Sequence, residues 1–397
     1  MAAGSQVVGN AHFDGPRPAQ LAEREALLEM VNAVFRVSRG FEATIASDWA
    51  HVYTPRNLEN VLVICDRSAG GKPVASTGIW VSDVRVASAS GQQGVVRVGG
   101  INCVGTLPEY RRHGFGSQVM AAVQQRMVEL KCQVGLLSTG IADWYRRLDW
   151  EEAGMQRTYR LNRGNVALLP ALRPEVRFRL VDLDTLTEPD ENGEASVAMD
   201  PHVAAQVVQV QQQGQLGALR EVKDFCRRCA ARRMQRLALL EDNGAIVAYL
   251  LLRDNMVAEW AGAPADVIGL LAACFGALDN PHVSTSQRDG NRPMLLVRAP
   301  GWAHPVTAQL DRLRIPFHMD YLGMMLLLEP QAVLDGCAAD RVTIEQVNGD
   351  YLVVEGDQRM TLNRRQLTKL LFGPERMGEV GAGIFPLRFW QWGLEMV

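Results

Sequence analysis

The amino-acid sequence predicts an α/β (α+β) protein with more than one domain. Three observations lead to this prediction. Short apolar strands alternate with amphipathic helical segments, the same order of segments returns in the second half, and 397 residues exceed the usual size of one domain. Hydrophobic residues make up 47% of the chain and charged residues 21%, the balance of an ordinary globular protein with a full core.

The first half begins with apolar residues at helical spacing over residues 21–37. Strands, helices and turns then follow one another as in an open sheet with a ligand at its strand ends. The expected strands are 61–65, 74–81, 95–106, 134–137 and 155–161, and the expected helices run from Gly114 to about residue 131 and over 142–148.

A segment rich in Pro, Asp, Glu and Arg, residues 168–192, predicts a domain junction. Beyond it the order returns in weaker form: helices around Val207 and Phe225, strands 237–240, 245–252 and 256–261, helix 265–278 and strand 294–297. Gly262-Ala263-Pro264 stands where the first half has its Gly-x-Gly turn. The second copy therefore lacks that turn.

The last part of the chain changes pattern. We expect a short helix at 331–334, a hairpin around Asn348-Gly349 and a helix from Asn363 through Leu371. The chain closes on residues 384–397, which are unusually apolar for a terminus. We expect this tail to be docked into the protein, which would fix the position of its terminal carboxylate.

Charge and cysteine usage narrow the class of protein. Lys and Arg number 41 against 44 Asp and Glu, and this net charge of −3 argues against a protein that wraps nucleic acid. No secretory leader is evident, and the longest apolar stretch, residues 267–278, is too short to span a bilayer. Seven cysteines without framework spacing indicate reduced thiols. We expect a cytoplasmic protein with no nucleic-acid or membrane partner.

The most informative segment runs from Val104 to Ser117, between a strand and a helix. Free backbone N–H groups and the helix dipole favour an anion there, and Arg111 and Arg112 add charged donors. The predicted ligand is a pyrophosphate. A P-loop would need Lys-Ser/Thr after the glycines, and a dinucleotide fold a third glycine where Val119 stands, so neither motif fits.

Arg111-x-x-Gly114-x-Gly116, with its preceding strand and Pro108, resembles the R/Q-x-x-G-x-G/A signature of the GNAT N-acetyltransferase superfamily. Residues 144–150, Trp-Tyr-Arg-Arg-Leu-Asp-Trp, look like the Tyr-x-Arg-Phe-Gly-Tyr segment of the Eis (enhanced intracellular survival) type. Asp149, where the family commonly has Gly, and the Gly116-Ser117 pair depart from that pattern.

The resemblance implies tandem GNAT folds, the second degenerate, followed by a small sterol-carrier-protein-like α+β domain. Residues 1–160 would form the GNAT domain with the acetyl-CoA site, 161–318 the degenerate copy, and 319–397 the sterol-carrier-type domain with the tail. It also implies a homohexamer. Acetyl-CoA would be the co-substrate, and no metal is expected.

The resemblance also assigns the cofactor site residue by residue. Val104, Gly105 and Thr106 would bind the pantetheine arm, and Gly140 and Ile141 would line the far wall. The pyrophosphate would lie on Arg111, Arg112, His113, Gly114, Phe115, Gly116 and Ser117.

The chemistry of acetyl transfer needs a neutral amine, a polarised carbonyl and a proton for the leaving thiolate. A backbone N–H near Val104 could polarise the carbonyl, and Tyr145 is the expected acid, although a purely structural aromatic is the alternative. By resemblance, the base would be the carboxylate of Val397. Glu395 is its rival.

We therefore expect an N-acetyltransferase acting on a small-molecule or peptide primary amine: an aminoglycoside, a polyamine, lysine or another small amine. One alternative is a catalytically silent CoA-binding sensor or apolar-ligand-binding protein. The other is a partner protein that uses the Arg-rich helix 227–236 as its surface.

Several other side chains have simple structural explanations. His113 is expected to face solvent or a phosphate, and Met324 and Met325 to lie in the core. The Arg-rich segment is expected to be a solvated helix face. Cys226 and Cys229 are expected to be two thiols on that helix, since a zinc site wants four ligands. Asp48 and Trp49 are weak candidates for amine contact.

Overall fold

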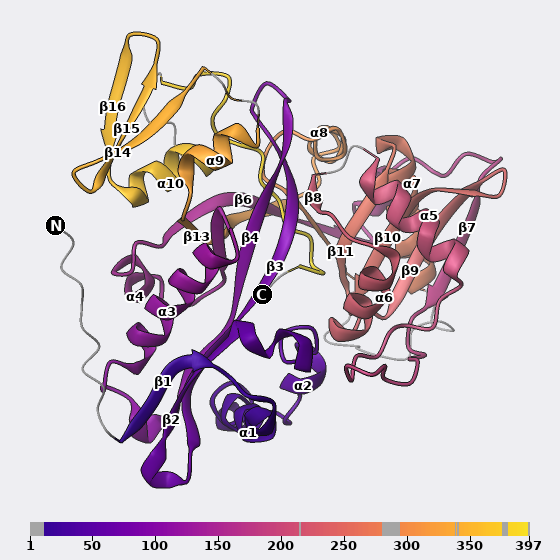
Figure 1. Cartoon of the computed structure of the whole chain (residues 1–397). Helices are drawn as coiled ribbons and strands as arrows, with labels where there is room; N and C mark the ends of the chain where they lie inside the picture. Colours follow the sequence, from indigo (N-terminus) through magenta and orange to yellow (C-terminus); the bar gives the residue numbers. More distant parts are fainter. Residues whose placement is uncertain are drawn as a thin grey trace.

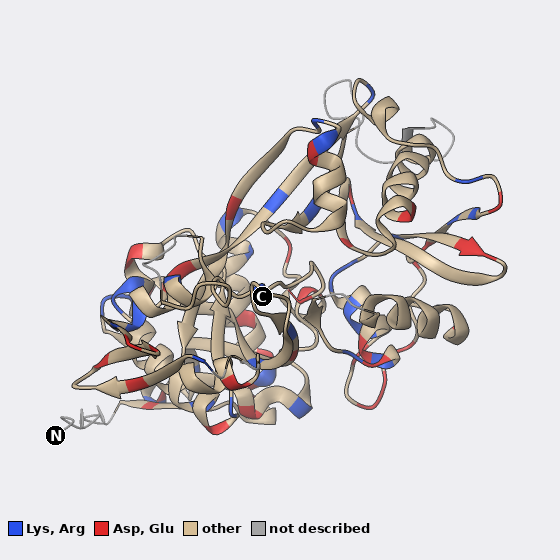
Figure 2. Ribbon diagram, turned by 90° about the horizontal axis from the view of Figure 1, so that it is seen from above, with Lys and Arg blue, Asp and Glu red and all other residues tan. Residues whose placement is uncertain are grey.

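The computed structural model describes residues 12–213, 216–279, 294–337, 339, 341–374 and 380–395. These residues form a mixed α/β fold, as predicted, with a thirteen-stranded sheet and a separate three-stranded sheet. Figure 1 shows three lobes in chain order, and the long hairpin of β3 (Lys72–Ala87) and β4 (Gln93–Thr106) reaches between them. Basic and acidic residues are interspersed along the chain (Figure 2).

The first lobe places its strands in the order β1-β2-β3-β4-β5. Alternate side chains of β2 enter two different apolar clusters. Leu62 and Ile64 join the cluster of α3, whereas Val61 and Val63 join that of α1, so helices cover both faces of the sheet. Besides β3 and β4, the elements are β1 (Phe13–Pro18), α1 (Arg24–Phe35), α2 (Ile45–Asp48), β2 (Val61–Asp66), α3 (Phe115–Glu129), β5 (Val134–Leu137), α4 (Ala142–Arg146) and β6 (Glu151–Asn162).

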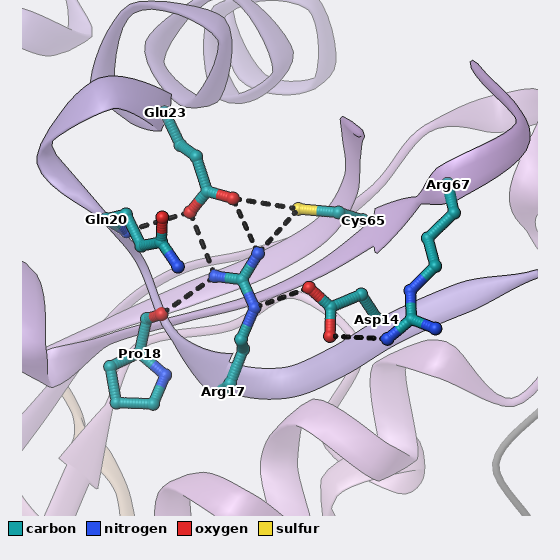
Figure 3. Close-up of polar contacts among 7 residues, drawn as sticks. All are labelled: Asp14, Arg17, Pro18, Gln20, Glu23, Cys65 and Arg67. Atoms are coloured by element: carbon teal, nitrogen blue, oxygen red, sulfur yellow. Dashed lines mark hydrogen bonds and ion pairs between the residues drawn. The ribbon is translucent and has the colours of Figure 1, made fainter. Parts of the chain in front are cut away.

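Strand β1, which the sequence pattern did not predict, is held by an ion-pair network (Figure 3). Arg17 donates from Nε to Asp14 at 2.7 Å and from Nη2 to Glu23 at 2.6 Å. Pro16 and Pro18 hid this strand because prolines are unfavourable in a sheet interior, but an edge strand accepts them. Since Glu23 lies directly before α1, the network fixes where that helix begins.

The second lobe repeats this order. Strands β11 and β12 are parallel and joined through α7, as β4 and β5 are parallel and joined through α3. The elements are β7 (Arg177–Asp182), α5 (Pro201–Gln212), β8 (Gly217–Ala218), α6 (Val222–Ala231), β9 (Arg236–Asp242), β10 (Ala245–Arg253), β11 (Met256–Gly262), α7 (Pro264–Asp279), β12 (Met294–Pro300) and α8 (Pro305–Arg312). The expected junction, residues 168–192, contains β7, which pairs with β9, so it is not a plain linker.

One strand from beyond the second lobe completes the first. Strand β13 (Phe317–Leu327) lies antiparallel between β5 and β6, and β6 in turn pairs with β12. Met324 and Met325 of β13 are buried in the core, as predicted. The large sheet therefore runs without a break through both lobes, and the division of the chain at residues 160 and 318 stays a prediction.

The third lobe contains α9 (Pro330–Asp335), β14 (Thr343–Val347), β15 (Asp350–Glu355), β16 (Gln358–Leu362) and α10 (Arg364–Phe372). The predicted hairpin is confirmed: Asn348 and Gly349 both have positive φ, 53° and 92°, as a two-residue turn of this kind requires. The kinship of this lobe with sterol-carrier proteins stays a prediction.

The described part of the tail, residues 380–395, is docked as expected. Phe389, Trp390 and Trp392 are buried, and the Gly393 N–H donates to the Ala258 carbonyl at 3.0 Å. Arg388 pairs with Ala87 at the end of β3, so the tail lies between the β3–β4 hairpin and the second lobe (Figure 1). Among the described residues, no helix is long and apolar enough to cross a membrane.

Candidate active site

The candidate site begins where two parallel strands part. Strand β4 pairs with β5 over Val98–Gly100, after which β4 continues to Thr106. Cys103 has a φ of 51°, and the register between β3 and β4 shifts around Ser76–Gly78, which marks a bulge at this point. Beyond Gly100, β4 no longer pairs with β5, so backbone N–H and C=O groups on this edge of β4 can hydrogen-bond a ligand.

A cavity of about 500 Å³ lies at this end of β4. Its walls contain all of the predicted cofactor residues except His113 and Gly140, and they include Tyr145. The remaining lining residues were not predicted: Val34, Phe35, Arg39, Tyr110 and Trp144. These five come from α1, the segment after it, the turn before α3, and α4, so sequence spacing alone could not bring them to β4.

The turn into α3 has the conformation that the sequence pattern implied. Gly114 has a φ of 78°, which favours glycine, and Arg112 has a φ of 69°. The Gln118 N–H donates to the Gly114 carbonyl at 3.1 Å, which places the amides of residues 115–117 in the first turn of the helix. This helix start is a favourable place for an anion.

Three guanidinium groups belong to the cavity wall. Arg39, Arg111 and Arg112 are all exposed, and the Arg111 Nε donates to the Thr106 carbonyl at 3.3 Å. Guanidinium groups and a helix N-terminus together form a donor set suited to a polyphosphate. Phe35, Val104 and Ile141 add apolar surface to the cavity wall, which suits an apolar stretch of ligand such as the pantetheine arm.

Tyr145 is the buried polar group of this cavity, with 6% of its surface exposed. Burial raises its pKa to about 12, so the phenol keeps its proton at neutral pH. Its ring packs edge-on against Trp144 at 4.7 Å between centroids. Its carbonyl accepts from Leu148 N and Trp150 N, and between them Asp149 has a φ of 65°, which explains why glycine suits this position.

The two predicted residues outside the cavity wall lie beside it. His113 is exposed and its ring stacks on that of Phe115 at 5.7 Å between centroids, and its part in phosphate binding stays a prediction. Gly140 directly precedes Ile141 and has open space where a Cβ would lie. Val397 lies outside the described residues.

Glu395 is buried at the junction of the lobes and is not among the residues that line the cavity. Its Oε1 lies 3.1 Å from Arg220 Nε and 3.6 Å from Arg228 Nη1. Burial raises its pKa despite these two cations. Glu395 therefore serves as an ion-pair partner of the second lobe.

The Arg-rich segment differs from the solvated face that we expected. Arg227 and Arg228 are buried, with Arg227 paired to Glu194 at 3.3 Å, because this side of α6 packs against the first lobe and a loop of the second. Asp48 is engaged by Arg36 at 2.8 Å and by Arg233 at 2.9 Å. Cys226 and Cys229 are free thiols on α6, as expected. Within the described residues, no cluster of His, Cys, Asp and Glu could hold a metal.

A second cavity, of about 460 Å³, occupies the corresponding place in the second lobe, lined by the end of α5, Gly262 and the start of α7. Ala263 alone separates β11 from α7, so no phosphate-sized turn exists there. Asp266 stands at this helix start, where the first lobe has arginines, and a carboxylate there repels a phosphate. The predicted loss of the anion-binding turn is confirmed.

Comparison with known proteins supports the interpretation of the first lobe. Residues 16–153 match the family model described as an acetyltransferase (GNAT) domain. This segment is therefore similar in sequence to acetyltransferase (GNAT) domains. None of the curated proteins matches the chain.

Solved structures extend the likeness in fold to nearly the whole chain. A GCN5-related N-acetyltransferase from Anabaena variabilis is 16% identical, covering 95% of this chain and 94% of its own, with a TM-score of 0.60. One from Kribbella flavida is 15% identical (92% and 84%, TM-score 0.59), and Eis1 from Mycobacterium abscessus is 14% identical (95% and 97%, TM-score 0.58). Nearly the whole chain thus shares its fold with these proteins.

Proposed function

We propose that the protein is an acetyl-CoA-dependent N-acetyltransferase that acts on a primary amine. One observation supports this proposal most strongly. The anion-binding turn of α3, the free edge of β4 and the buried phenol of Tyr145 line a single cavity of about 500 Å³. The GNAT domain match over residues 16–153 names the same chemistry.

In this proposal Arg111, Arg112 and the first turn of α3, through Ser117, hold the pyrophosphate, with His113 beside them at the surface. Val104, Gly105 and Thr106 orient the pantetheine arm, and Gly140 and Ile141 form the far wall. Bound acetyl-CoA would supply an activated acetyl group as its thioester.

The proton transfers are assigned to groups of this chain. The Val104 N–H polarises the thioester carbonyl while the amine nitrogen bonds to the carbonyl carbon. As the carbon–sulfur bond breaks, the Tyr145 hydroxyl gives its proton to the departing sulfur. Because burial holds the Tyr145 pKa at about 12, the proton is present throughout the physiological range.

The amine must also lose a proton. We assign the base to the carboxylate of Val397 rather than to Glu395, whose carboxylate contacts Arg220 and Arg228. Assembly into a homohexamer and a sterol-carrier role for residues 319–397 stay predictions from the family resemblance.

The test is turnover with acetyl-CoA. Incubation of the full chain with acetyl-CoA and a panel of primary amines should release free thiol and give an N-acetylated amine, detected by mass spectrometry. Tight acetyl-CoA binding without thiol release for any amine would instead favour a CoA-binding sensor.

A further inference from the structure

Three arginines of the second lobe gather where the two lobes meet, and we call Arg228, Arg232 and Arg298 the arginine cluster. Arg228 lies on α6, Arg232 follows that helix, and Arg298 lies on β12. Arg228 is 5% exposed and Arg298 is 4% exposed, which is rare for a charged side chain.

Each member of the arginine cluster lies against an aromatic ring from outside its own lobe. Arg228 Cζ lies 5.1 Å from the centre of the Trp80 ring, and Arg232 Cζ lies 4.4 Å from that of Trp49. Both rings belong to the first lobe. Arg298 Cζ lies 5.2 Å from the ring of Trp390 in the tail. The arginine cluster is thus held by aromatic rings from the first lobe and from the tail.

The hydrogen-bonding capacity of the arginine cluster is largely unused. Arg228 Nε and Nη1, Arg232 Nε, and Arg298 Nη1 and Nη2 are buried without a hydrogen-bond partner among the described residues. Arg298 Nε donates to Gln156 at 2.8 Å, and Glu395 approaches Arg228 at 3.6 Å. Glu395, Asp48, Asp224 and Glu259 supply negative charge nearby, but none of these carboxylates hydrogen-bonds the five nitrogen atoms.

A neighbouring arginine shows that the fold can pair a buried guanidinium closely with a carboxylate. Arg220 makes a two-pronged pair with Glu259, with nitrogen–oxygen distances of 3.1 and 2.7 Å. By contrast, the pKa values of Arg232 and Arg298 are lowered to about 10, mainly by burial and also by neighbouring arginines. An unpaired buried charge is strongly unfavourable, so this arrangement calls for an anion from outside the chain.

The arginine cluster lies close to the candidate active site. The Arg228 guanidinium packs on the ring of Trp80, and Trp80 pairs with Gly100 of β4. Gly100 is the last residue of β4 that pairs with β5. Beyond that residue β4 leads into the acetyl-CoA cavity. Arg228 therefore packs against the strand next to the one that leads into the candidate cavity.

We propose that the arginine cluster binds an anionic group of the acceptor, so that the substrate is a small primary amine that also carries a carboxylate or a phosphate. This inference rests on the proposed acetyltransferase function and specifies its substrate class. A guanidinium offers paired donors that match both kinds of anion.

The test compares amines that differ in their second group. To test a carboxylate, 4-aminobutyrate is compared with butylamine and 1,4-diaminobutane. To test a phosphate, 2-aminoethyl phosphate is compared with ethanolamine. We expect kcat/KM for at least one amine with an anionic group to exceed that of its counterpart without that group by about 100-fold, the scale of two charged hydrogen bonds. The comparison that shows the preference identifies the anion.

Substitution then assigns the preference to the arginine cluster. Arg298→Gln should raise KM for the preferred amine by about 10-fold or more. KM for the counterpart without the anionic group should change little, and acetyl-CoA affinity should not change. Arg359→Gln, the same charge change on the exposed strand β16, should have no effect. Arg298→Lys retains the charge without the paired donors and serves if Arg298→Gln fails to fold.

The outcomes separate the two proposals. Equal efficiency of thiol release with amines that carry an anionic group and with amines that lack one would overturn the arginine-cluster assignment and leave the acetyltransferase function intact. If no amine releases thiol, the acetyltransferase function fails. The cluster is then judged by thermal unfolding: a rise in Tm with 4-aminobutyrate or 2-aminoethyl phosphate that Arg298→Gln abolishes supports an anion site, and no rise contradicts it.

Discussion

A Cβ placed on Gly116 would lie 3.4 Å from Cζ2 of Trp144, so the turn into α3 and helix α4 approach each other closely and a side chain larger than a methyl group would press on the Trp144 ring. This contact joins the two segments that the sequence pattern singled out, the glycine turn and the aromatic segment 144–150. In the proposed function, this close approach sets the width of the acetyl-CoA site beside residue 116.

Gly116→Val should weaken acetyl-CoA binding by about 10-fold or more, because the added methyl groups must displace Trp144 or fill the cavity. Isothermal titration calorimetry measures this loss. Gly276→Ala, in α7 where nothing lies within 4 Å of a built Cβ, is the matched control and should bind as the wild type does. Unchanged binding by Gly116→Val would mean that the cofactor lies elsewhere.

Replacing both Arg111 and Arg112 by alanine should weaken acetyl-CoA binding most at low salt. Both side chains are exposed, so their attraction for the phosphates is screened as ionic strength rises. Dissociation constants measured at two salt concentrations should therefore converge with those of the wild type at high salt. A loss independent of salt would indicate that the substitutions distort the turn instead.

The pH dependence of kcat follows from Tyr145. Its acid form is the active one, and burial raises its pKa to about 12, so its contribution is complete below that pKa and disappears only as pH rises through it. We expect kcat with a fully deprotonated amine to stay level between about pH 8 and 10, around the pKa of an ordinary tyrosine. A fall centred in that range would contradict a buried phenol as the acid.

Much of the fold was predictable, because local patterns dictate it. The spacing of apolar residues gave α1, α3 and β5 within a few residues, and the Asn348-Gly349 turn gave the third-lobe hairpin. Strand β13 could not be placed from sequence, since its position between β5 and β6 depends on pairing with residues more than 150 positions away. Long-range pairing of this kind leaves no local signal.

The residues of the candidate site were likewise predictable only where a local motif marks them. The glycine turn and Tyr145 carry motifs, whereas Phe35 and Arg39 reach the cavity only through the packing of α1 against β4. The arginines of α6 were misjudged for a related reason. A basic helix face is usually solvated. Arg227 and Arg228 are buried because α6 packs against the first lobe and a loop of the second, which no local pattern predicts.

The buried pair of Arg220 and Glu259 should matter for stability rather than for chemistry. Tyr249 also donates to Glu259, so Glu259→Gln breaks a fully buried network and should lower the free energy of unfolding by about 3–5 kcal/mol. Urea unfolding followed by circular dichroism measures this change. Glu345→Gln, on an exposed position of β14, should leave the midpoint unchanged; a similar loss there would point to a general charge effect.

Adding a few residues after Val397 should reduce kcat strongly and leave acetyl-CoA affinity intact, because the proposed base is moved while the turn of α3 is untouched. Kinetics and calorimetry on the same extended protein separate the two effects. Full activity of the extended protein would exclude the terminal carboxylate as the base.

The most direct test of acetyl transfer at this site is thiol release from acetyl-CoA, with amine present, by the untagged wild type and by Tyr145→Phe. The account predicts amine-dependent release by the wild type and a kcat about 100-fold lower in the variant, with acetyl-CoA bound equally well by both. Equal kcat for the two proteins would contradict Tyr145 as the acid, and the absence of release from the wild type with every amine would contradict the acetyltransferase itself.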